Sequence, residues 1–315
     1  MWNKEKGYYD LMRELWGSPQ RWNARRTYAD VAAKLGVDEE TVRNRLKRMK
    51  DSGFLVGWRV VPNPANFGRE SAMMLLRFED QERKETGVAN LKRADGVITL
   101  ASAYGTELIV TYFDDPGHKD SKRIAKTRGV AEAQSIGGML MPSTDFTMTP
   151  TDWEIVQLTI RDAELNLRLV AKKAKVSPRT VKRRLNNMID SSAISVMPII
   201  DQSKSGGVQY TMMIESAVGR TDEIVEMVAP KIRNLVFSAA YSNDGLIFGF
   251  TAQNVAEGAE ALRRVRNLGG IKLVRLLMID EVIYVFDWLE REAEARTAGG
   301  VRTAKKDRTS GRARP

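Results

Sequence analysis

The chain has 315 residues, of which 43% are hydrophobic and 29% charged, an ordinary globular composition that excludes wholesale disorder. It contains no cysteine and one histidine, which excludes disulfides, thiolate zinc sites, cysteine nucleophiles and multi-histidine metal centres. The net charge of +10 favours a polyanionic partner. No apolar stretch approaches the ~20 residues that cross a bilayer, and the N-terminus lacks the apolar core of a signal peptide, so we expect a cytoplasmic protein.

Motifs of the common enzyme classes are missing from the sequence. The phosphate-binding GxxxxGK[ST], the dinucleotide-binding GxGxxG and the nucleophile-elbow GxSxG patterns do not occur. Carboxylates remain as metal ligands, but no acidic cluster with ligand spacing is apparent. The sequence therefore predicts neither an enzyme nor a metal site, and we expect no cofactor.

The first elements along the chain are predicted to be three helices, at about 8–16, 28–35 and 38–50. Gly36 and Val37 form a short turn between the second and third, and Asp38 is a suitable N-cap for the third. Alternating apolar residues from Phe54 to Val60 then indicate a strand or wing. This order is that of a winged helix-turn-helix domain, which we assign to residues 1–62.

The next segment reads strand, helix, strand, strand, helix, strand. The expected elements lie at 71–78, 82–93, 97–104, 107–113, 116–128 and 133–141. The order β-α-β-β-α-β is that of a ferredoxin-like domain, assigned to residues 68–146. Helices cover one face of such a sheet, and the other face needs a partner sheet, so we expect self-association.

The second half of the chain repeats the first. Shifting the sequence by 139 aligns residues 27–55 with 166–194, and eleven of these 29 pairs are identical. Chance would give roughly two at average residue usage. A duplication therefore predicts a second helix-turn-helix domain at 150–200, with helices at 152–160 and 167–174 and a third helix capped by Ser177 with Pro178 at its first position.

A second ferredoxin-like domain follows at residues 207–290. Its elements are expected at 210–216, 221–233, 235–241, 246–251, 255–268 and 272–285, and Asn243-Asp244-Gly245 is a strong hairpin-turn signal. Residues 291–315 are predicted to be a basic disordered tail, since residues 296–315 alone carry a net charge of +6. Both a solubilising role and nonspecific phosphate contact remain open for it.

The third helix of each helix-turn-helix domain has one apolar and one basic face. Val42, Leu46 and Met49 share a face at helical spacing and are predicted to pack the core. The outward faces carry cations and asparagines, and either a solvated surface or DNA contact explains a basic face. Because arginine and asparagine bond purine edges and the major groove admits a helix, we favour DNA.

Two sets of residues are predicted to contact DNA. Those expected at base edges are Arg43, Asn44, Lys47, Lys182, Arg183 and Asn186. Those expected at phosphates are Arg45, Arg48, Arg179, Arg184 and the wing residue Arg59. Because the two copies differ in sequence, we expect the preferred site to be an imperfect repeat.

Two stretches carry a family resemblance. TVRNRLKRMKDSGFLVGWRVVPNPANFG (41–68) resembles the recognition helix, wing and hinge strand of the Lrp/AsnC regulators of bacteria and archaea. DWEIVQLTIRDAELNLRLVAKKAKVSPRTVKRRLNNM (152–188) resembles their N-terminal helices. The resemblance covers about residues 5–290 as two fused copies. It implies an α+β fold of helix-turn-helix and ferredoxin-like (RAM-type) domains, and a DNA-binding transcription regulator that is a homo-oligomer or an intrachain pseudo-dimer.

Small-molecule effectors of this family imply a further candidate site. The turns between the middle strands of the two ferredoxin-like domains contain Gly105, Thr106, Glu107, Asn243 and Asp244. Neither turn matches the Gly-x-x-Asp type expected of family members that bind amino acids. Plain hairpin turns therefore remain the alternative.

Two other functions stay open. The same helices with little sequence preference would make an architectural DNA-coating protein. The same domain order also occurs in siroheme decarboxylases, which resemble these regulators and whose chemistry relies on histidine and arginine around a tetrapyrrole. This chain has only His118, which is expected in a solvated loop.

Overall fold

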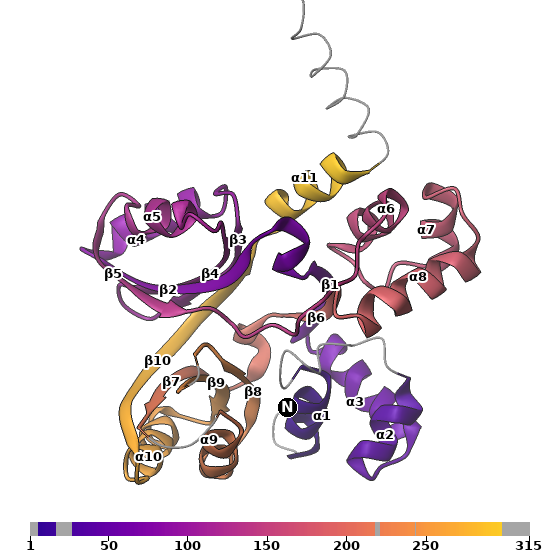
Figure 1. The fold of residues 1–315 in the computed structure, drawn as a ribbon. Coiled ribbons are helices and arrows are strands. Elements are labelled where there is room, and N and C mark those ends of the chain that lie inside the picture. The colour runs from indigo at the N-terminus through magenta and orange to yellow at the C-terminus, as the bar shows by residue number, and fades with distance from the viewer. Residues whose placement is uncertain (1–5, 17–26, 218–220, 243, 298–315) are drawn as a thin grey trace, which may run out of the picture.

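The computed structural model describes residues 6–16, 27–217, 221–242 and 244–297 (Figure 1). Two helix-turn-helix domains lie on one side of the molecule and two ferredoxin-like domains on the other. The expected α+β architecture is confirmed. Among the described residues, no helix combines the length and the apolarity that crossing a membrane requires.

The first helix-turn-helix domain consists of α1 (Lys6–Trp16), α2 (Tyr28–Leu35) and α3 (Glu39–Asp51). The Thr27 side chain accepts from the amide of Asp30 and thereby caps α2. The Asp38 side chain accepts from the amide of Thr41 and caps α3, as the sequence predicts.

The second helix-turn-helix domain consists of α6 (Pro150–Thr159), α7 (Leu167–Lys173) and α8 (Pro178–Asp190). Thr149 and Asp152 form a reciprocal capping box at the start of α6. Ser177 caps α8, and Pro178 occupies its first turn. The two domains therefore begin their third helices with the same cap geometry.

The strands expected as wings join the two halves of the chain. β1 (Leu55–Pro62) and β6 (Ile194–Ile200) pair antiparallel in a two-stranded sheet, with Trp58 opposite Pro198. One hydrophobic core runs beneath this sheet and includes buried residues of both helix-turn-helix domains, Val42 and Val181 among them. The two domains are thus held together as one unit.

Short 3-10 helices, η3 (Pro64–Phe67) and η4 (Gln202–Ser205), lead from these strands into the ferredoxin-like domains. The elements of the first are β2 (Glu70–Phe78), α4 (Gln81–Leu91), β3 (Val97–Ala103), β4 (Glu107–Asp114), α5 (Lys119–Ala125) and β5 (Val130–Gly137). The elements of the second are β7 (Val208–Ser216), α9 (Thr221–Val228), η5 (Ala229–Lys231), β8 (Leu235–Ala240), β9 (Gly245–Ala252), α10 (Val255–Arg266) and β10 (Ile271–Tyr284).

The two ferredoxin-like sheets are continuous through β10. The strand order is β5-β2-β4-β3-β10-β7-β9-β8. The first part of β10 pairs with β7 of its own domain, and its last part pairs with β3 of the other domain, with Val282 opposite Ala101. In Figure 1 this strand crosses from one domain to the other.

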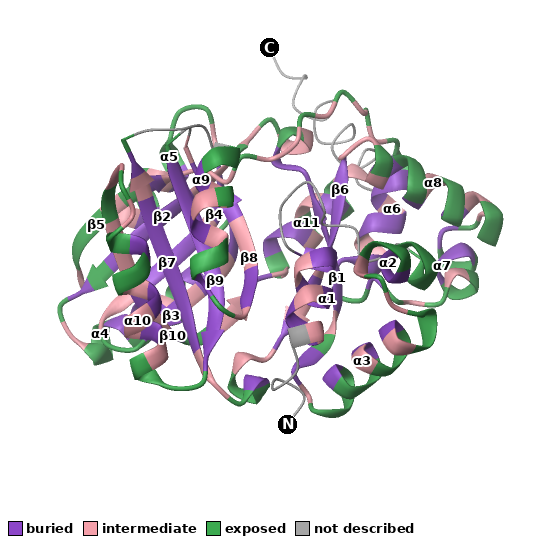
Figure 2. Ribbon diagram, turned by 90° about the horizontal axis from the view of Figure 1, so that it is seen from below, coloured by how far each residue is buried: buried purple, intermediate pink, exposed green. Residues whose placement is uncertain are grey.

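The open faces of the two sheets cover each other. Side chains from both sheets, including Met73, Ile109, Met213 and Leu277, form one buried cluster between them. The helices α4 and α5 cover the outer face of the first sheet, and α9 and α10 cover that of the second (Figure 2). The partner face that the sequence requires is therefore supplied within the chain, as in the pseudo-dimer alternative.

The two sheets meet along two seams. The first is the pairing of β3 with β10, and the second, where the chain after β5 meets β8, is much shorter. After β5 the chain turns at Gly137, whose φ of +111° suits only glycine, and passes close to the carbonyl of Tyr241. The Leu140 amide then donates to the carbonyl of Ala240 at 2.9 Å, on the edge strand β8. The two seams differ although the two halves repeat the same order of domains.

The chain does not leave the fold at residue 291, where the tail was expected to begin. A further helix, α11 (Asp287–Arg296), follows β10. It is anchored because Trp288, Leu289 and Ala293 are buried. The expected tail is therefore corrected for residues 291–296, which are helical, and its residues 298–315 lie outside the described part of the chain.

Candidate DNA interface

The recognition helix α3 presents a polar face away from the core. Arg43, Asn44 and Lys47 are exposed between the buried Val42, Leu46 and Met49, which lie on the opposite side. The Arg43 guanidinium lies 5.7 Å from the ring centroid of Tyr28 on α2. The Lys47 ammonium pairs with Asp51 at 2.8 Å, and both side chains are largely exposed, so this pair contributes little to stability.

The basic face of the recognition helix α8 makes fewer side-chain contacts than that of α3. Arg179, Lys182, Arg183 and Asn186 are exposed. None of these side chains makes a hydrogen bond or ion pair with another described residue. Figure 2 shows the exposed sides of α3 and α8 along the outer rim of the molecule. Both helices are thus accessible to a duplex.

Two of the arginines expected at phosphates have structural partners instead. Arg45 donates to the carbonyl of Gly7 at 3.2 Å, and Arg184 donates to Asp152 at 2.8 Å and to Thr149 at 3.1 Å. These arginines occupy equivalent positions of the repeat, and each ties the recognition helix to the first helix of its own domain.

The basic residues nearest the end of α3 are also engaged. Arg48 is exposed but donates to the hydroxyl of Tyr8 at 3.2 Å. Lys50 pairs at 2.7 Å with Glu164 of the second helix-turn-helix domain. This ion pair adds a direct link between the two domains.

The expectation that Arg59 contacts a phosphate is wrong. Its side chain is only 2% exposed. The guanidinium lies 4.6 Å from the ring centroid of Tyr284 and donates to Thr99 Oγ1 at 3.0 Å and to the carbonyl of Ile98 at 3.4 Å. Burial lowers the pKa of Arg59 to about 10. The side chain is buried because β1 packs against the ferredoxin-like domain instead of extending into solvent as a wing.

The candidate effector residues fall at two separate places. Glu107 lines a cavity of about 300 Å3 between the two ferredoxin-like sheets, whereas Asp244 lies at the β8–β9 turn and accepts from Ser242 at 2.9 Å. Asn243 lies outside the described residues. Gly105 is positioned by the buried Lys84, whose ammonium donates to its carbonyl at 2.7 Å, and Thr106 completes that turn.

The cavity has an apolar floor and a charged rim. The residues that line it are Leu75, Arg77, Glu107, Glu132, Gln134, Arg275, Leu276 and Leu277. Arg77 pairs with Glu132 at 2.7 Å, and Arg275 donates to Gln134 at 3.0 Å across the two domains. This geometry suits a small polar molecule with an apolar part.

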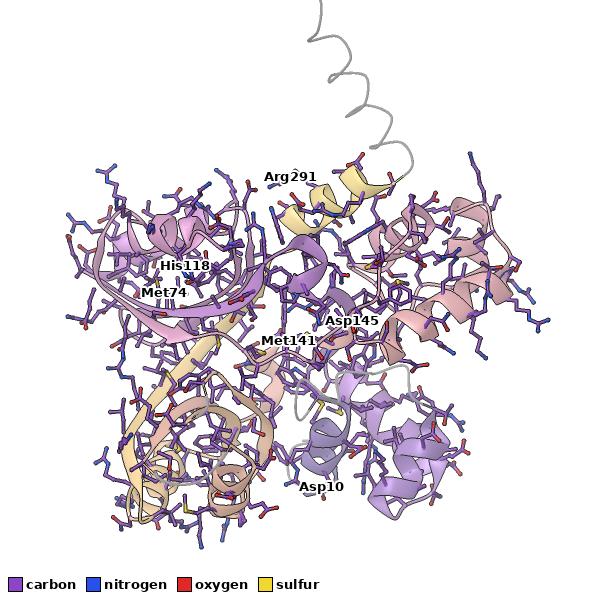
Figure 3. All side chains as sticks on the ribbon, in the orientation of Figure 1. Asp10, Met74, His118, Met141, Asp145 and Arg291 are labelled. Atoms are coloured by element: carbon purple, nitrogen blue, oxygen red, sulfur yellow. The ribbon has the colours of Figure 1, made fainter. Side chains whose placement is uncertain are left out.

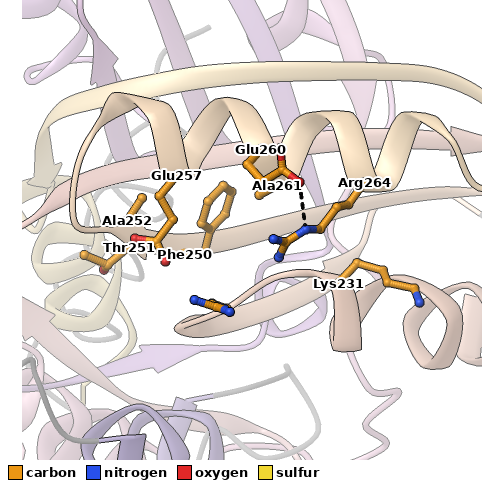
Figure 4. Close-up of a pocket in the computed structure, with 9 residues that line it drawn as sticks. Lys231, Phe250, Thr251, Ala252, Glu257, Glu260, Ala261 and Arg264 are labelled. Carbon is orange, nitrogen blue, oxygen red and sulfur yellow. Dashed lines mark hydrogen bonds and ion pairs between the residues drawn. The ribbon is translucent and has the colours of Figure 1, made fainter.

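A second pocket lies beneath α10 (Figure 4). It measures about 50 Å3, enough for one or two water molecules. Part of its charge is neutralised, since Glu260, which lines the pocket, pairs with Arg264 at 3.1 Å and with Arg263 at 2.6 Å. This pocket offers no room for a cofactor.

The structure brings together an acidic group that the sequence spacing did not suggest. Asp114, Asp115 and Asp120 have carboxylate oxygens within 4.8 Å of one another. Asp120 pairs with Arg69 at 2.5 Å and with Arg123 at 2.7 Å. These cations neutralise part of the group, which therefore reads as a structural cluster.

His118 lies beside this cluster in the first ferredoxin-like domain, away from both helix-turn-helix domains (Figure 3). Its ring is 70% exposed, and its Nδ1 lies 2.9 Å from the Asp114 carboxylate. Its backbone adopts the left-handed region with φ of 54°, at the start of α5. It lines neither of the two cavities described above.

Known domain families match both helix-turn-helix domains. Residues 21–50, which contain α2 and most of α3, match the AsnC-type helix-turn-helix domain. Residues 148–194, which contain α6 to α8, match a winged helix-turn-helix DNA-binding domain. These matches and the fold define the class of the protein. It is a chain with two helix-turn-helix domains, of which the first matches the AsnC type, and this arrangement fits tandem duplication.

Curated relatives are regulators of archaea. The HTH-type transcriptional regulator Ptr1 of Methanocaldococcus jannaschii is 32% identical over 83 residues, 26% of this chain and 56% of Ptr1. The HTH-type transcriptional regulator LrpA of Pyrococcus horikoshii is 28% identical over 116 residues, 35% of this chain and 82% of LrpA. The expected resemblance to Lrp-family regulators is confirmed by these homologues, although the match spans little more than half of Ptr1.

A solved structure shares the whole architecture. The siroheme decarboxylase NirDL superposes with a TM-score of 0.57 over 92% of this chain and 98% of its own. The sequence identity is 14%, so this likeness concerns the fold alone. It shows that a chain with this double arrangement of domains has a precedent.

Proposed function

We propose that the chain is a sequence-specific DNA-binding transcription regulator of the Lrp/AsnC type. The observation that carries the proposal is that α3 and α8 both turn exposed basic faces to solvent while one continuous core fixes them to each other. The fused ferredoxin-like domains hold this assembly together. DNA binding also places the protein at the nucleoid in the cytoplasm.

In this proposal the exposed side chains divide the work. Base edges are read by Arg43, Asn44 and Lys47 on α3 and by Lys182, Arg183 and Asn186 on α8. Arg48 and Arg179 would hold phosphates and set the register on the duplex. The buried Arg59 has no part in it.

The intrachain pseudo-dimer has a consequence for affinity. Two recognition helices that are already joined bind a double site without first paying the entropy of association. One chain should therefore occupy one operator, and its occupancy should follow a single-site isotherm. A protein that had to dimerise first would show a concentration-dependent lag.

The test is a DNA footprint. Genomic fragments are first enriched by selection for binding to the purified chain, and the sites that the chain protects on them are then mapped. Discrete protected sites would support a regulator. Continuous coverage without boundaries would instead support the architectural coating protein. No protection at all, at a salt concentration where nonspecific binding is suppressed, would contradict both.

A second candidate function rests on the fold shared with NirDL. Tetrapyrrole chemistry of the kind described for siroheme decarboxylases relies on histidine, and the one histidine here is an exposed residue paired with Asp114. We expect the purified chain mixed with an iron porphyrin to show the absorption spectrum of the free porphyrin. A shifted spectrum that saturates at one equivalent would favour the enzyme.

The cavity between the sheets supports a role in effector binding. Its rim offers two arginines and two glutamates within one opening, and its position between both domains lets a ligand act on their packing. We expect free amino acids, screened singly, to raise the melting temperature of the chain if this role is correct. Glu107→Gln should abolish that rise, and the absence of any stabilising amino acid would contradict the role.

A further inference from the structure

The two recognition helices have the same length and the same cap position, so they can be compared residue by residue. Each has 13 residues. Within residues 39–50, the positions that turn inward are identical in both helices: Thr41/Thr180, Val42/Val181, Arg45/Arg184, Leu46/Leu185 and Met49/Met188. Within the same range, every position that is exposed on α3 differs: Glu39/Pro178, Glu40/Arg179, Arg43/Lys182, Asn44/Arg183, Lys47/Asn186, Arg48/Asn187 and Lys50/Ile189; only the last residues of the two helices, the exposed Asp51 and Asp190, are identical.

The exposed differences are ordered along the helix. The first turn of α3 is acidic, with Glu39 and Glu40, and its cations come later. The first turn of α8 has no acidic residue, and Arg179 begins a cationic face that ends in the amides of Asn186 and Asn187. Along α3 the exposed side chains thus change from acidic to basic, whereas along α8 they change from basic to uncharged amides.

The N-terminal part of a recognition helix is the part that meets base edges in helix-turn-helix complexes. Glu40 and Asn44 lie one turn apart on one face of α3, and Arg179 and Arg183 occupy the equivalent face of α8. Arginine bonds guanine bidentately, asparagine bonds adenine, and glutamate accepts from the amino group of cytosine. The two faces therefore offer different hydrogen-bonding patterns to the same groove.

The geometry points to asymmetric recognition of DNA by the two helices. Glu40 and Asn44 on α3 determine one half-site, and Arg179 and Arg183 on α8 determine a different one. The half-site under α8 carries guanines, and the half-site under α3 carries cytosine and adenine at the equivalent positions. Arg179 then reads a base edge instead of holding a phosphate. This inference rests on the proposed DNA-binding function and names its specificity.

Packing supports this assignment because it leaves all four side chains free. Glu40, Asn44, Arg179 and Arg183 are exposed and have no side-chain partner among the described residues. Changing them should leave the helical core untouched. Conversely, the shared inward residues keep both helices in the same pose, so a difference in specificity has to come from the outward positions.

The experiment selects sites for the full chain from a pool of random duplexes. It uses the double variant Glu40→Arg/Asn44→Arg, which gives α3 the face of α8. The reciprocal variant is Arg179→Glu/Arg183→Asn. The control is Glu82→Arg/Asn90→Arg, which makes the same charge change at exposed positions of α4. Circular dichroism and melting temperature check that each variant is folded.

The wild-type chain should select a site whose two halves differ, with guanines in one half. The Glu40→Arg/Asn44→Arg variant should select a site with two guanine-containing halves and bind it about tenfold more tightly than the wild type does. The reciprocal variant should lose the guanines from the wild-type site. The control should select the wild-type site.

Two results would overturn the inference while leaving the proposed function intact. One is a wild-type site with two equal halves. The other is an affinity gain of the double variant that is equal on every duplex, including unselected ones, since this would be a pure charge effect. Failure of the wild type to enrich any sequence would instead refute sequence-specific DNA binding itself, and the inference with it.

Discussion

Arg59 and Arg179 are both arginines in a basic helix-turn-helix protein, but their surroundings differ completely. Arg59 lies inside, against the rings of Tyr284 and Phe286, whereas Arg179 is exposed at the start of α8. Alternation along β1 predicts that the Arg59 side chain is exposed, on the face of the strand opposite to that of the buried Trp58. The alternation fails because both faces of β1 are covered, a long-range consequence that local pattern does not contain.

Replacing each of these arginines separates stability from binding. Arg59→Ala should lower the free energy of unfolding by about 2 kcal/mol, because it removes the contacts with the two rings and the hydrogen bonds to the Thr99 hydroxyl and to the Ile98 carbonyl, which keeps only the Val285 amide as a donor. Arg179→Ala should change stability by less than about 0.5 kcal/mol and weaken specific DNA binding. Urea titrations and fluorescence anisotropy measure the two effects. If Arg59→Ala instead weakened DNA binding and left stability unchanged, Arg59 would have to contact DNA.

A buried tyrosine predicts how the fold responds to alkali. Burial raises the pKa of Tyr9 to about 12, and its side chain also hydrogen-bonds with Thr251. Above pH 10 the unfolded chain releases this proton while the folded chain keeps it. The contribution of Tyr9 is therefore complete below pH 10 and is lost as the pH rises towards 12.

The free energy of unfolding of the wild type should thus fall between pH 10 and 12 more steeply than that of Tyr9→Phe. The difference should amount to at most about 2–3 kcal/mol, which corresponds to a two-unit shift. Urea unfolding at a series of alkaline pH values gives both curves. Parallel curves would show that Tyr9 titrates normally and that α1 does not bury it.

At the scale of elements, most helices and strands were predictable, because each is amphipathic over its own length and has clear ends. The Asp38 and Ser177 caps and the 139-residue repeat identified both recognition helices. The helix α11 was missed because its sequence is mostly charged. Its apolar residues, Trp288, Leu289 and Ala293, lie at spacings that mark one helical side, and this signal was available.

The helix α11 links the second helix-turn-helix domain to the first ferredoxin-like domain. The Trp288 ring lies 5.2 Å from Phe67 and 5.9 Å from Phe113. On the other side, Arg161 pairs with Asp287 at 2.8 Å and with Glu290 at 2.5 Å. The helix thus fixes the position from which α8 is presented.

Removing the anchor of α11 should therefore affect both stability and DNA binding. Trp288→Ala should cost about 3–5 kcal/mol of unfolding free energy, because a fully buried indole leaves a cavity. Affinity for the double site should fall, since the second domain is held less firmly. Trp288→Phe and a chain that ends at Thr297 serve as controls that keep the helix. A Trp288→Ala protein as stable as the wild type would contradict this role.

At the scale of the molecule, the chain is a dimer-like assembly encoded in one polypeptide. The pairing of β1 with β6 and of β3 with β10 joins its halves at two separate places. The sequence predicted that a partner sheet is needed but left open whether it comes from the same chain, because pairing between distant strands is set by packing and not by local pattern. The unequal lengths of β5 and β10 also make one seam longer than the other.

In the proposed complex, a single chain binds one duplex with α3 and α8 together. The most direct test is a hydroxyl-radical footprint on a selected duplex, titrated with the chain up to one equivalent. We predict two protected windows on one face of the duplex, separated by a whole number of helical turns of about 10 base pairs, that fill together and saturate at one chain per duplex. A single window, or windows that need a second equivalent to fill, would show that one chain does not bind with both helices together.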